Sequence, residues 1–171
     1  MNRTQVLKSV IAVSAFFLAA CTLAQQDGGL RTIAVDGAPK AIGPYAQGIV
    51  ANGLLYTAGQ TARDPATGNP VSGDIGVQTN RVLDNLEAIL KGAGCTLQDV
   101  IKVTVFMTDL GDFAKMNEVY AARFGSHRPA RSTVQISKLP SNAQLEIDVV
   151  ARVGLPNRTP LSANRWTVQA P

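Results

Sequence analysis

Few side chains in this sequence of 171 residues have the type and spacing that common catalytic sites require. His127 is the only histidine, which makes a histidine-based metal cluster impossible, and it lies in a Gly-Ser-His-Arg-Pro loop. The sequence has no Gly-x-Ser-x-Gly nucleophile elbow, so a Ser-His-Asp triad is not expected. Cys95 follows Gly92-Ala93-Gly94 in a helix-exit turn, where no second cysteine or histidine nearby suggests a thiolate nucleophile. We therefore expect no bound metal and a structural role for Cys95.

The composition is that of one globular domain. Apolar residues make up 46% of the chain and charged residues 16%, which excludes a disordered, collagen-like or coiled-coil protein. The 16 basic residues include Arg3 and Lys8, which leaves 14 against 12 acidic residues in the rest of the chain. This near balance gives little support for a nucleic-acid partner, and none is expected.

Residues 1–24 have the pattern of an export signal. Arg3 and Lys8 form a positively charged start, and the apolar run from Val10 to Ala20 is too short to span a membrane as a helix. We expect this signal peptide to direct the chain out of the cytosol.

The end of this segment predicts a lipid anchor. Leu18-Ala19-Ala20-Cys21 resembles the bacterial lipobox, whose cysteine is acylated and becomes the new N-terminus. Thr22 rather than Asp follows Cys21, which resembles lipoproteins sent to the outer membrane. We therefore expect a periplasmic or cell-envelope protein that touches the membrane only through lipidated Cys21. Cleavage after Ala24, which would release a soluble periplasmic protein, is the alternative.

Hydrophobic periodicity and turn residues predict alternating strands and helices. Asn52-Gly53 is typical of a type I′ hairpin turn, and Asp74 is a suitable helix N-cap. The expected elements are a strand over 31–35, a hairpin over 47–60, a helix from Asp74 to Lys91, a strand from Val100 to Met107, a helix that Asp109 or Asp112 caps and Gly125 ends, and strands over 132–138 and 144–153. This order indicates an α+β domain with both helices on one face of the sheet.

The other face of the sheet predicts an oligomer. We expect Ile101 and Val103 to face the helices and Lys102 to face away from them. The face away from the helices should also carry apolar side chains, namely Val100, Phe106 and Val150. A face that is both charged and apolar suggests that several sheets meet face to face and enclose a partly polar barrel.

Five short motifs occur along the chain in a characteristic order. They are Ile42-Gly43-Pro44-Tyr45-Ala46-Gln47, Thr57-Ala58-Gly59-Gln60, Val103-Thr104-Val105-Phe106-Met107-Thr108-Asp109, Pro129-Ala130-Arg131-Ser132-Thr133-Val134 and Leu145-Glu146-Ile147-Asp148-Val149-Val150-Ala151. In order and spacing they resemble the signatures of the RidA family, also called the YjgF family. The resemblance covers residues 31–153 and leaves the signal peptide and a C-terminal tail, residues 154–171, outside it.

The resemblance implies a fold and an activity. The fold is the chorismate-mutase-like α+β fold of the bacillus type, a mixed six-stranded sheet with two helices on one face, assembled as a homotrimer. The activity is hydrolytic deamination of reactive 2-enamine or 2-imino acids, such as 2-aminoacrylate and 2-iminopropanoate, to 2-keto acids and ammonia without a cofactor. The partners so implied are the small 2-imino or 2-keto acid and two further copies of the chain.

The resemblance also assigns roles to individual residues. Arg131 matches the arginine that clamps the substrate carboxylate, Glu146 the glutamate that positions the attacking water, and Tyr45 the tyrosine that walls the site from an adjoining subunit. Ala58, Gly59 and Thr133 match positions that line the substrate pocket. These residue types suit the reaction, because a guanidinium binds a carboxylate through two parallel N–H groups and a carboxylate can take a proton from water.

Three positions depart from the usual family pattern. Ala58 stands where serine is common, Thr133 where cysteine is common and Gly111 where asparagine is frequent. We expect these departures to affect rate or choice of substrate. The alternative function is a trimer that binds a small carboxylate such as a 2-keto acid without turnover, as a sensor or scaffold; ribonuclease or holdase-like activity is less favoured.

Overall fold

The Asn52-Gly53 turn forms the hairpin that its sequence predicts. In the computed structural model, which describes residues 29–154, both residues have positive φ, 52° and 74°. The turn joins β2 (Gly48–Ala51) to β3 (Leu54–Thr57). The expected signal peptide with Cys21 and nearly all of the expected tail lie outside the described residues.

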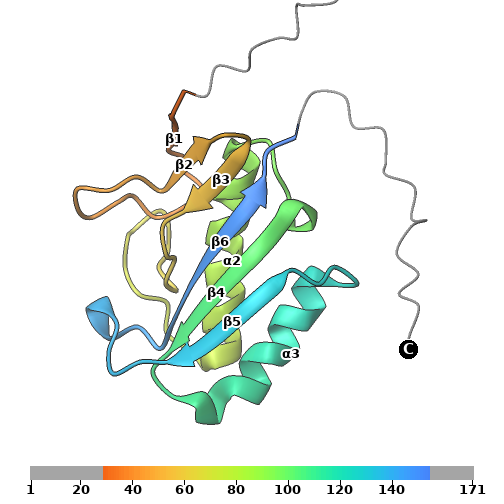
Figure 1. Ribbon diagram of the computed structural model, residues 1–171. Coiled ribbons are helices and arrows are strands. Elements are labelled where there is room, and N and C mark those ends of the chain that lie inside the picture. The colour runs from red at the N-terminus through yellow and green to blue at the C-terminus, as the bar shows by residue number, and fades with distance from the viewer. Residues whose placement is uncertain (1–28, 155–171) are drawn as a thin grey trace, which may run out of the picture.

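Two helices cover one face of a mixed six-stranded sheet (Figure 1). The other elements are β1 (Arg31–Ile33), α2 (Ile75–Gly92), β4 (Val100–Met107), α3 (Phe113–Phe124), β5 (Ala130–Gln135) and β6 (Leu145–Arg152), with short 3-10 turns η1 (Leu97–Asp99), η2 (Leu110–Asp112) and η3 (Pro140–Asn142). The strand order is β1-β2-β3-β6-β4-β5, in which β4 and β5 are parallel and all other neighbours are antiparallel. The expected α+β architecture is therefore confirmed.

Helix α2 begins and packs as its sequence predicts. Asp74 Oδ1 accepts a hydrogen bond from the Val77 backbone N–H at 2.9 Å and so caps the first turn. Val82, Leu83 and Leu86 are completely buried against the sheet. Burial of each such side chain stabilises the fold by roughly 1.5–3 kcal/mol, so this stripe fixes the helix on the sheet.

Helix α3 begins directly after Asp112, one of the two caps that the sequence offered. Asp109 caps the 3-10 turn η2 instead, where its Oδ1 accepts a hydrogen bond from Gly111 N at 2.7 Å. Asp112 stands at the N-cap position of α3 without a side-chain hydrogen bond. Met116, Tyr120 and Phe124 are buried at helical spacing, and Gly125, with φ of 60°, ends the helix as expected. No helix within residues 29–154 is long and apolar enough to cross a membrane.

The expected faces of Val100 and Ile101 are wrong because β4 contains a bulge. Val100 pairs with Ala151 and Lys102 with the preceding residue of β6, so Ile101 is an extra residue in the ladder. Val100 is therefore fully buried, while Ile101 is 47% exposed. Beyond the bulge Val103 is buried and the predicted alternation returns.

The strand that carries Arg131 begins earlier than expected. We expected a strand over 132–138, whereas β5 spans Ala130–Gln135. Its parallel pairing with β4 starts at Ala130 opposite Lys102 and ends where Ile136 N donates to Met107 O at 2.8 Å. Arg131 therefore lies within an edge strand, where alternation fixes the direction of its side chain.

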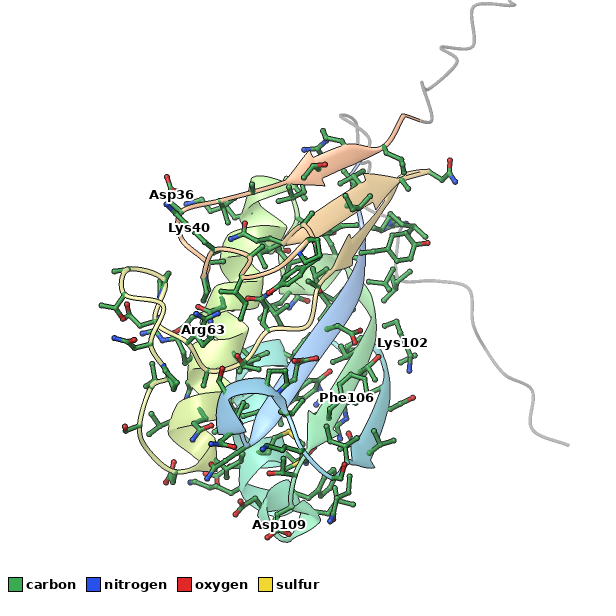
Figure 2. All side chains as sticks on the ribbon, turned by 90° about the vertical axis from the view of Figure 1, so that its left-hand side faces the viewer. Asp36, Lys40, Arg63, Lys102, Phe106 and Asp109 are labelled. Atoms are coloured by element: carbon green, nitrogen blue, oxygen red, sulfur yellow. The ribbon has the colours of Figure 1, made fainter. Side chains whose placement is uncertain are left out.

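The sheet face away from the helices is charged and partly apolar. It carries Lys102, Phe106 and Asp148, which are half-buried, and Tyr56, which is 47% exposed. Figure 2 shows Lys102 on the side of the sheet away from α2. This is the mixed character expected of the face, with Val100 removed from it by the bulge.

Candidate functional site

A small cavity opens beside the start of β6, where three loops meet. Its volume is about 170 Å³, the space of roughly six water molecules. Lys40 and Tyr45 come from the loop between β1 and β2, Gly59 and Arg63 from the loop after β3, Ser141 from η3, and Glu146 from β6. Figure 2 looks onto this side of the molecule, with Lys40 and Arg63 on the two loops. The cavity admits a small molecule only.

Glu146 is the one acidic side chain among the described residues that line this cavity. Alternation along β6 buries Leu145 and Ile147 under the helices and directs Glu146 to the opposite face. Burial raises the pKa of this half-buried carboxyl group, and the negative charge of Asp148, two residues along the same face, raises it further. A carboxylate held in this way is a better proton acceptor than one in free solution.

Gln47 holds the loop that carries Tyr45, and the sequence interpretation did not single it out. This buried side chain accepts a hydrogen bond from Val35 N at 2.6 Å and donates to the carbonyl groups of Val35, Ala38 and Pro39 at 2.9–3.1 Å. One amide group thus fixes a stretch of loop that has no strand partner. A glutamine directly after the Gly-Pro-Tyr-Ala segment was the available signal.

Tyr45 lies at the mouth of the cavity. This residue is 51% exposed, and its hydroxyl accepts a weak hydrogen bond from Ile42 N at 3.3 Å. An exposed aromatic ring at the rim of a cavity can close it when a second surface or a ligand is present. The structure therefore places Tyr45, Gly59 and Glu146 of one chain around the same cavity.

Arg131 lies against α3, outside this cavity. Its Nη2 donates to Asn117 Oδ1 at 2.8 Å, and its guanidinium carbon stands 4.5 Å from the centre of the Tyr120 ring and 5.8 Å from that of Phe113. The aromatic faces favour the cation, and the asparagine orients it. Burial raises the pKa of Tyr120, and the nearby positive charge of Arg131 opposes that rise. Asn117 and Tyr120 thus hold the Arg131 side chain in place, and their helical spacing in the sequence did not reveal this contact.

One chain does not bring Arg131 and Glu146 to the same ligand. Arg131 stands on β5, and two strand spacings of the sheet, about 10 Å, separate β5 from β6. Arg131 also pairs with the buried Val103 and so faces the helices, whereas Glu146 faces away from them. The two groups can share a substrate only if a second copy of the chain brings its own Arg131 to the cavity.

Thr133 and Ala58 have different surroundings. Thr133 follows Arg131 on the helix side of β5, and its Oγ1 is buried without a hydrogen-bond partner among the described residues. Ile136 N donates to β4, so alternation directs the N–H groups of Arg131 and Thr133 toward the free edge of the sheet. These are donors that an arriving carboxylate can use. Ala58 N donates to Gln47 O at 2.9 Å, next to Gly59, but Ala58 does not itself line the cavity.

His127 and Cys95 each lie against a backbone carbonyl group of the fold. His127 Nε2 lies 2.7 Å from the carbonyl oxygen of Val100, which ties the loop after α3 to the start of β4. Cys95 is buried, with its Sγ 3.5 Å from the carbonyl oxygen of Arg152. Within residues 29–154 no group of three histidine, cysteine or carboxylate side chains is placed to hold a metal ion.

Comparison with known proteins gives the same family by sequence and by structure. The family described as Endoribonuclease L-PSP matches residues 35–153. A RutC family protein of Pyrococcus horikoshii is 54% identical over 121 residues, which cover 71% of this chain and 96% of that protein. The 2-iminobutanoate/2-iminopropanoate deaminase of Escherichia coli is 43% identical over 124 residues, which cover 71% of this chain and 96% of that protein.

A solved structure has the same fold. It is a Rid family protein of Yersinia pestis, of unknown function, which is 44% identical and superposes with a TM-score of 0.71 over 73% of this chain and all of that one. The matched region contains the cavity with Glu146 and the strand with Arg131. The chain therefore belongs to the Endoribonuclease L-PSP family, and the resemblance of its motifs to the RidA proteins is confirmed at the level of the family.

Proposed function

We propose that this protein hydrolyses reactive 2-imino acids and their 2-enamine tautomers to 2-keto acids and ammonia. The name of the relative from Escherichia coli supports this reaction. The observation that carries the proposal is Glu146, a half-buried carboxyl group of raised pKa in a cavity for a small molecule. It supplies the proton acceptor that an attacking water molecule needs.

The reaction can be written with this chain's own groups. Water attacks the imine carbon and a C–O bond forms, while Glu146 accepts one proton of the water and passes it to the nitrogen. Glu146 then takes the proton of the new hydroxyl group and delivers it to the amine, and the C–N bond breaks to release ammonia as the C=O bond forms. The water oxygen ends in the keto group and both of its hydrogens leave on ammonia. A positioned carboxylate supplies about 10²–10⁴-fold in such a step.

The complete site lies, in this proposal, between subunits of a homotrimer. Arg131 of one subunit clamps the substrate carboxylate, and the N–H groups at the free edge of β5 add donors to it. Glu146, Tyr45 and the wall around Gly59 come from the next subunit. The separation of Arg131 from Glu146 in one chain and the charged, partly apolar sheet face both support this assembly.

Export remains part of the proposal. The basic start, the short apolar run and Cys21 favour a lipoprotein of the periplasmic side of the envelope, with soluble release after Ala24 as the alternative. Mass spectrometry of the N-terminus of protein from its own cells distinguishes a diacylated Cys21 from an unmodified Gln25.

The experiment that tests the activity uses an amino-acid oxidase to generate imines in the presence of the protein. Faster release of ammonia from 2-iminopropanoate than in its absence is the expected result. Saturable binding of pyruvate in calorimetry with no acceleration would replace the enzyme by a carboxylate-binding protein. Cleavage of RNA in place of imine turnover would support the ribonuclease activity that the family description names. The sole histidine, however, is hydrogen-bonded to the backbone carbonyl of Val100.

Gly59 provides a test of the cavity wall. A Cβ at this position would overlap the Glu146 carboxyl group and lie 2.8 Å from its Cγ, so Gly59→Ala must displace that side chain. We expect a loss of about 10²-fold in kcat/KM for 2-iminopropanoate, because displacement of a catalytic group by 1 Å can cost that much. Gly29→Ala is the control, since nothing lies within 4 Å of its Cβ. Unchanged kcat/KM in a folded Gly59→Ala protein would remove Glu146 from the reaction.

A further inference from the structure

Two basic side chains line the cavity in addition to Glu146. Lys40 comes from the loop between β1 and β2, and Arg63 comes from the loop after β3. Figure 2 shows the two residues on separate loops of the same side of the molecule. The proposed reaction of a simple imino acid uses neither of them, because Arg131 of the next subunit takes the carboxylate that every 2-imino acid has.

Neither cation is neutralised inside the described fold. The ion pairs within residues 29–154 involve only Arg81, Lys115 and Arg123 as the positive partners. Glu146 forms no ion pair with either of them among the described residues. The cavity therefore has two positive side chains that no described acidic residue pairs with and that a ligand can bind.

Arg63 is held in a fixed loop. Its Nε donates to Gly68 O at 2.7 Å, and its backbone carbonyl accepts a hydrogen bond from Asn85 Nδ2 at 3.0 Å. Asn85 is completely buried on α2, so it anchors this loop to the core. Asp64 closes the same loop by accepting hydrogen bonds from Ala66 N and Thr67 N, both at 2.9 Å. Because Nε is occupied by Gly68, the two Nη groups are the donors left for a ligand.

The ligand that fits two free cations and a small cavity is a second carboxylate on a short chain. A guanidinium and an ammonium both donate strong, charge-assisted hydrogen bonds to carboxylate oxygens. The volume of about 170 Å³ leaves room for a short acidic side chain but not for a large anion. We propose that the cavity prefers 2-imino acids with a second carboxylate, the imines of acidic amino acids, and that Lys40 and Arg63 bind this carboxylate; the inference rests on the proposed deaminase function.

The test compares two imines in the same assay. A glutamate oxidase generates the dicarboxylic imine and an alanine-oxidising enzyme generates 2-iminopropanoate, in the presence of the full-length protein. Wild type should have the higher kcat/KM for the dicarboxylic imine. Lys40→Met and Arg63→Met should each lower that value about tenfold or more, mainly through KM, and should lower the value for 2-iminopropanoate by much less. Lys91→Met, on α2 and outside this cavity, should leave both values unchanged.

Two results would overturn the inference while the deaminase function stands. One is equal kcat/KM for the two imines in wild type, and the other is an equal loss on both imines in Lys40→Met and Arg63→Met. If no imine is turned over at all, the deaminase function fails, and calorimetry with 2-oxoglutarate and pyruvate still tests the subsite. Tighter binding of 2-oxoglutarate that Lys40→Met and Arg63→Met abolish would keep it, and equal binding of the two acids would reject it.

Discussion

Glu146→Gln is expected to lower kcat/KM for imine hydrolysis by about 10²–10⁴-fold, since glutamine keeps the shape of the side chain but cannot accept a proton from water. Glu118→Gln is the matched control, because Glu118 is exposed on α3 and pairs only with Lys115. In wild type, kcat/KM should fall as the pH drops through the raised pKa of Glu146. The pH profile of the residual activity of Glu146→Gln should lack this fall. A Glu146→Gln enzyme as active as wild type would disprove the mechanism.

The same substitution should stabilise the fold at neutral pH. The folded chain holds the Glu146 proton more tightly than the unfolded chain, so folding stability falls as the pH rises from the unfolded pKa to the raised folded one. Glutamine does not ionise and avoids this loss. Glu146→Gln should therefore melt at a higher temperature than wild type at pH 7, and the difference should shrink below about pH 4. Thermal unfolding at both pH values checks the sign, and an unchanged or lower melting temperature at pH 7 would contradict it.

Local chemistry made much of the fold predictable. A type I′ turn needs positive φ at two residues, and Asn-Gly adopts it readily. Asp74 caps α2 by binding an N–H group of the next turn. Neither feature depends on distant parts of the chain. The alternation along β6 likewise fixed which side chains face the helices and which face away. The alternation along β6 is the feature that directs Glu146 into the cavity.

The errors lie where a distant partner decides the outcome. The bulge at Ile101 arises from the register of β4 against β6, which no pattern within β4 reveals. The start of β5 at Ala130 depends in the same way on its pairing with Lys102. Asn117 and Gln47 act through side-chain hydrogen bonds to residues 14 and 8–12 positions away, so their roles became visible only in the folded chain.

Arg131→Ala is expected to reduce kcat/KM for every 2-imino acid by about 100-fold or more, because the substrate loses the group that orients its carboxylate. Arg131→Lys should recover only part of the loss, since an ammonium lacks the paired N–H groups of a guanidinium. Loss of the cation over the Tyr120 ring should lower the free energy of unfolding by only about 0.5–1 kcal/mol. Chemical denaturation can measure this difference. Arg31→Ala, on the exposed start of β1, controls for the loss of one positive charge. Wild-type turnover by Arg131→Ala would reject the clamp.

Mixing two inactive variants tests whether the clamp comes from a neighbouring subunit. Arg131→Ala retains Glu146, and Glu146→Gln retains Arg131. If each site combines Arg131 of one chain with Glu146 of another, co-expression of the two variants in equal amounts gives roughly a quarter of the sites both intact groups, because each partner is chosen independently. About that fraction of wild-type activity should return in the mixture, while either variant alone stays inactive. If one chain contained the whole site, the mixture would stay as inactive as its components, since every chain in it would lack one of the two groups.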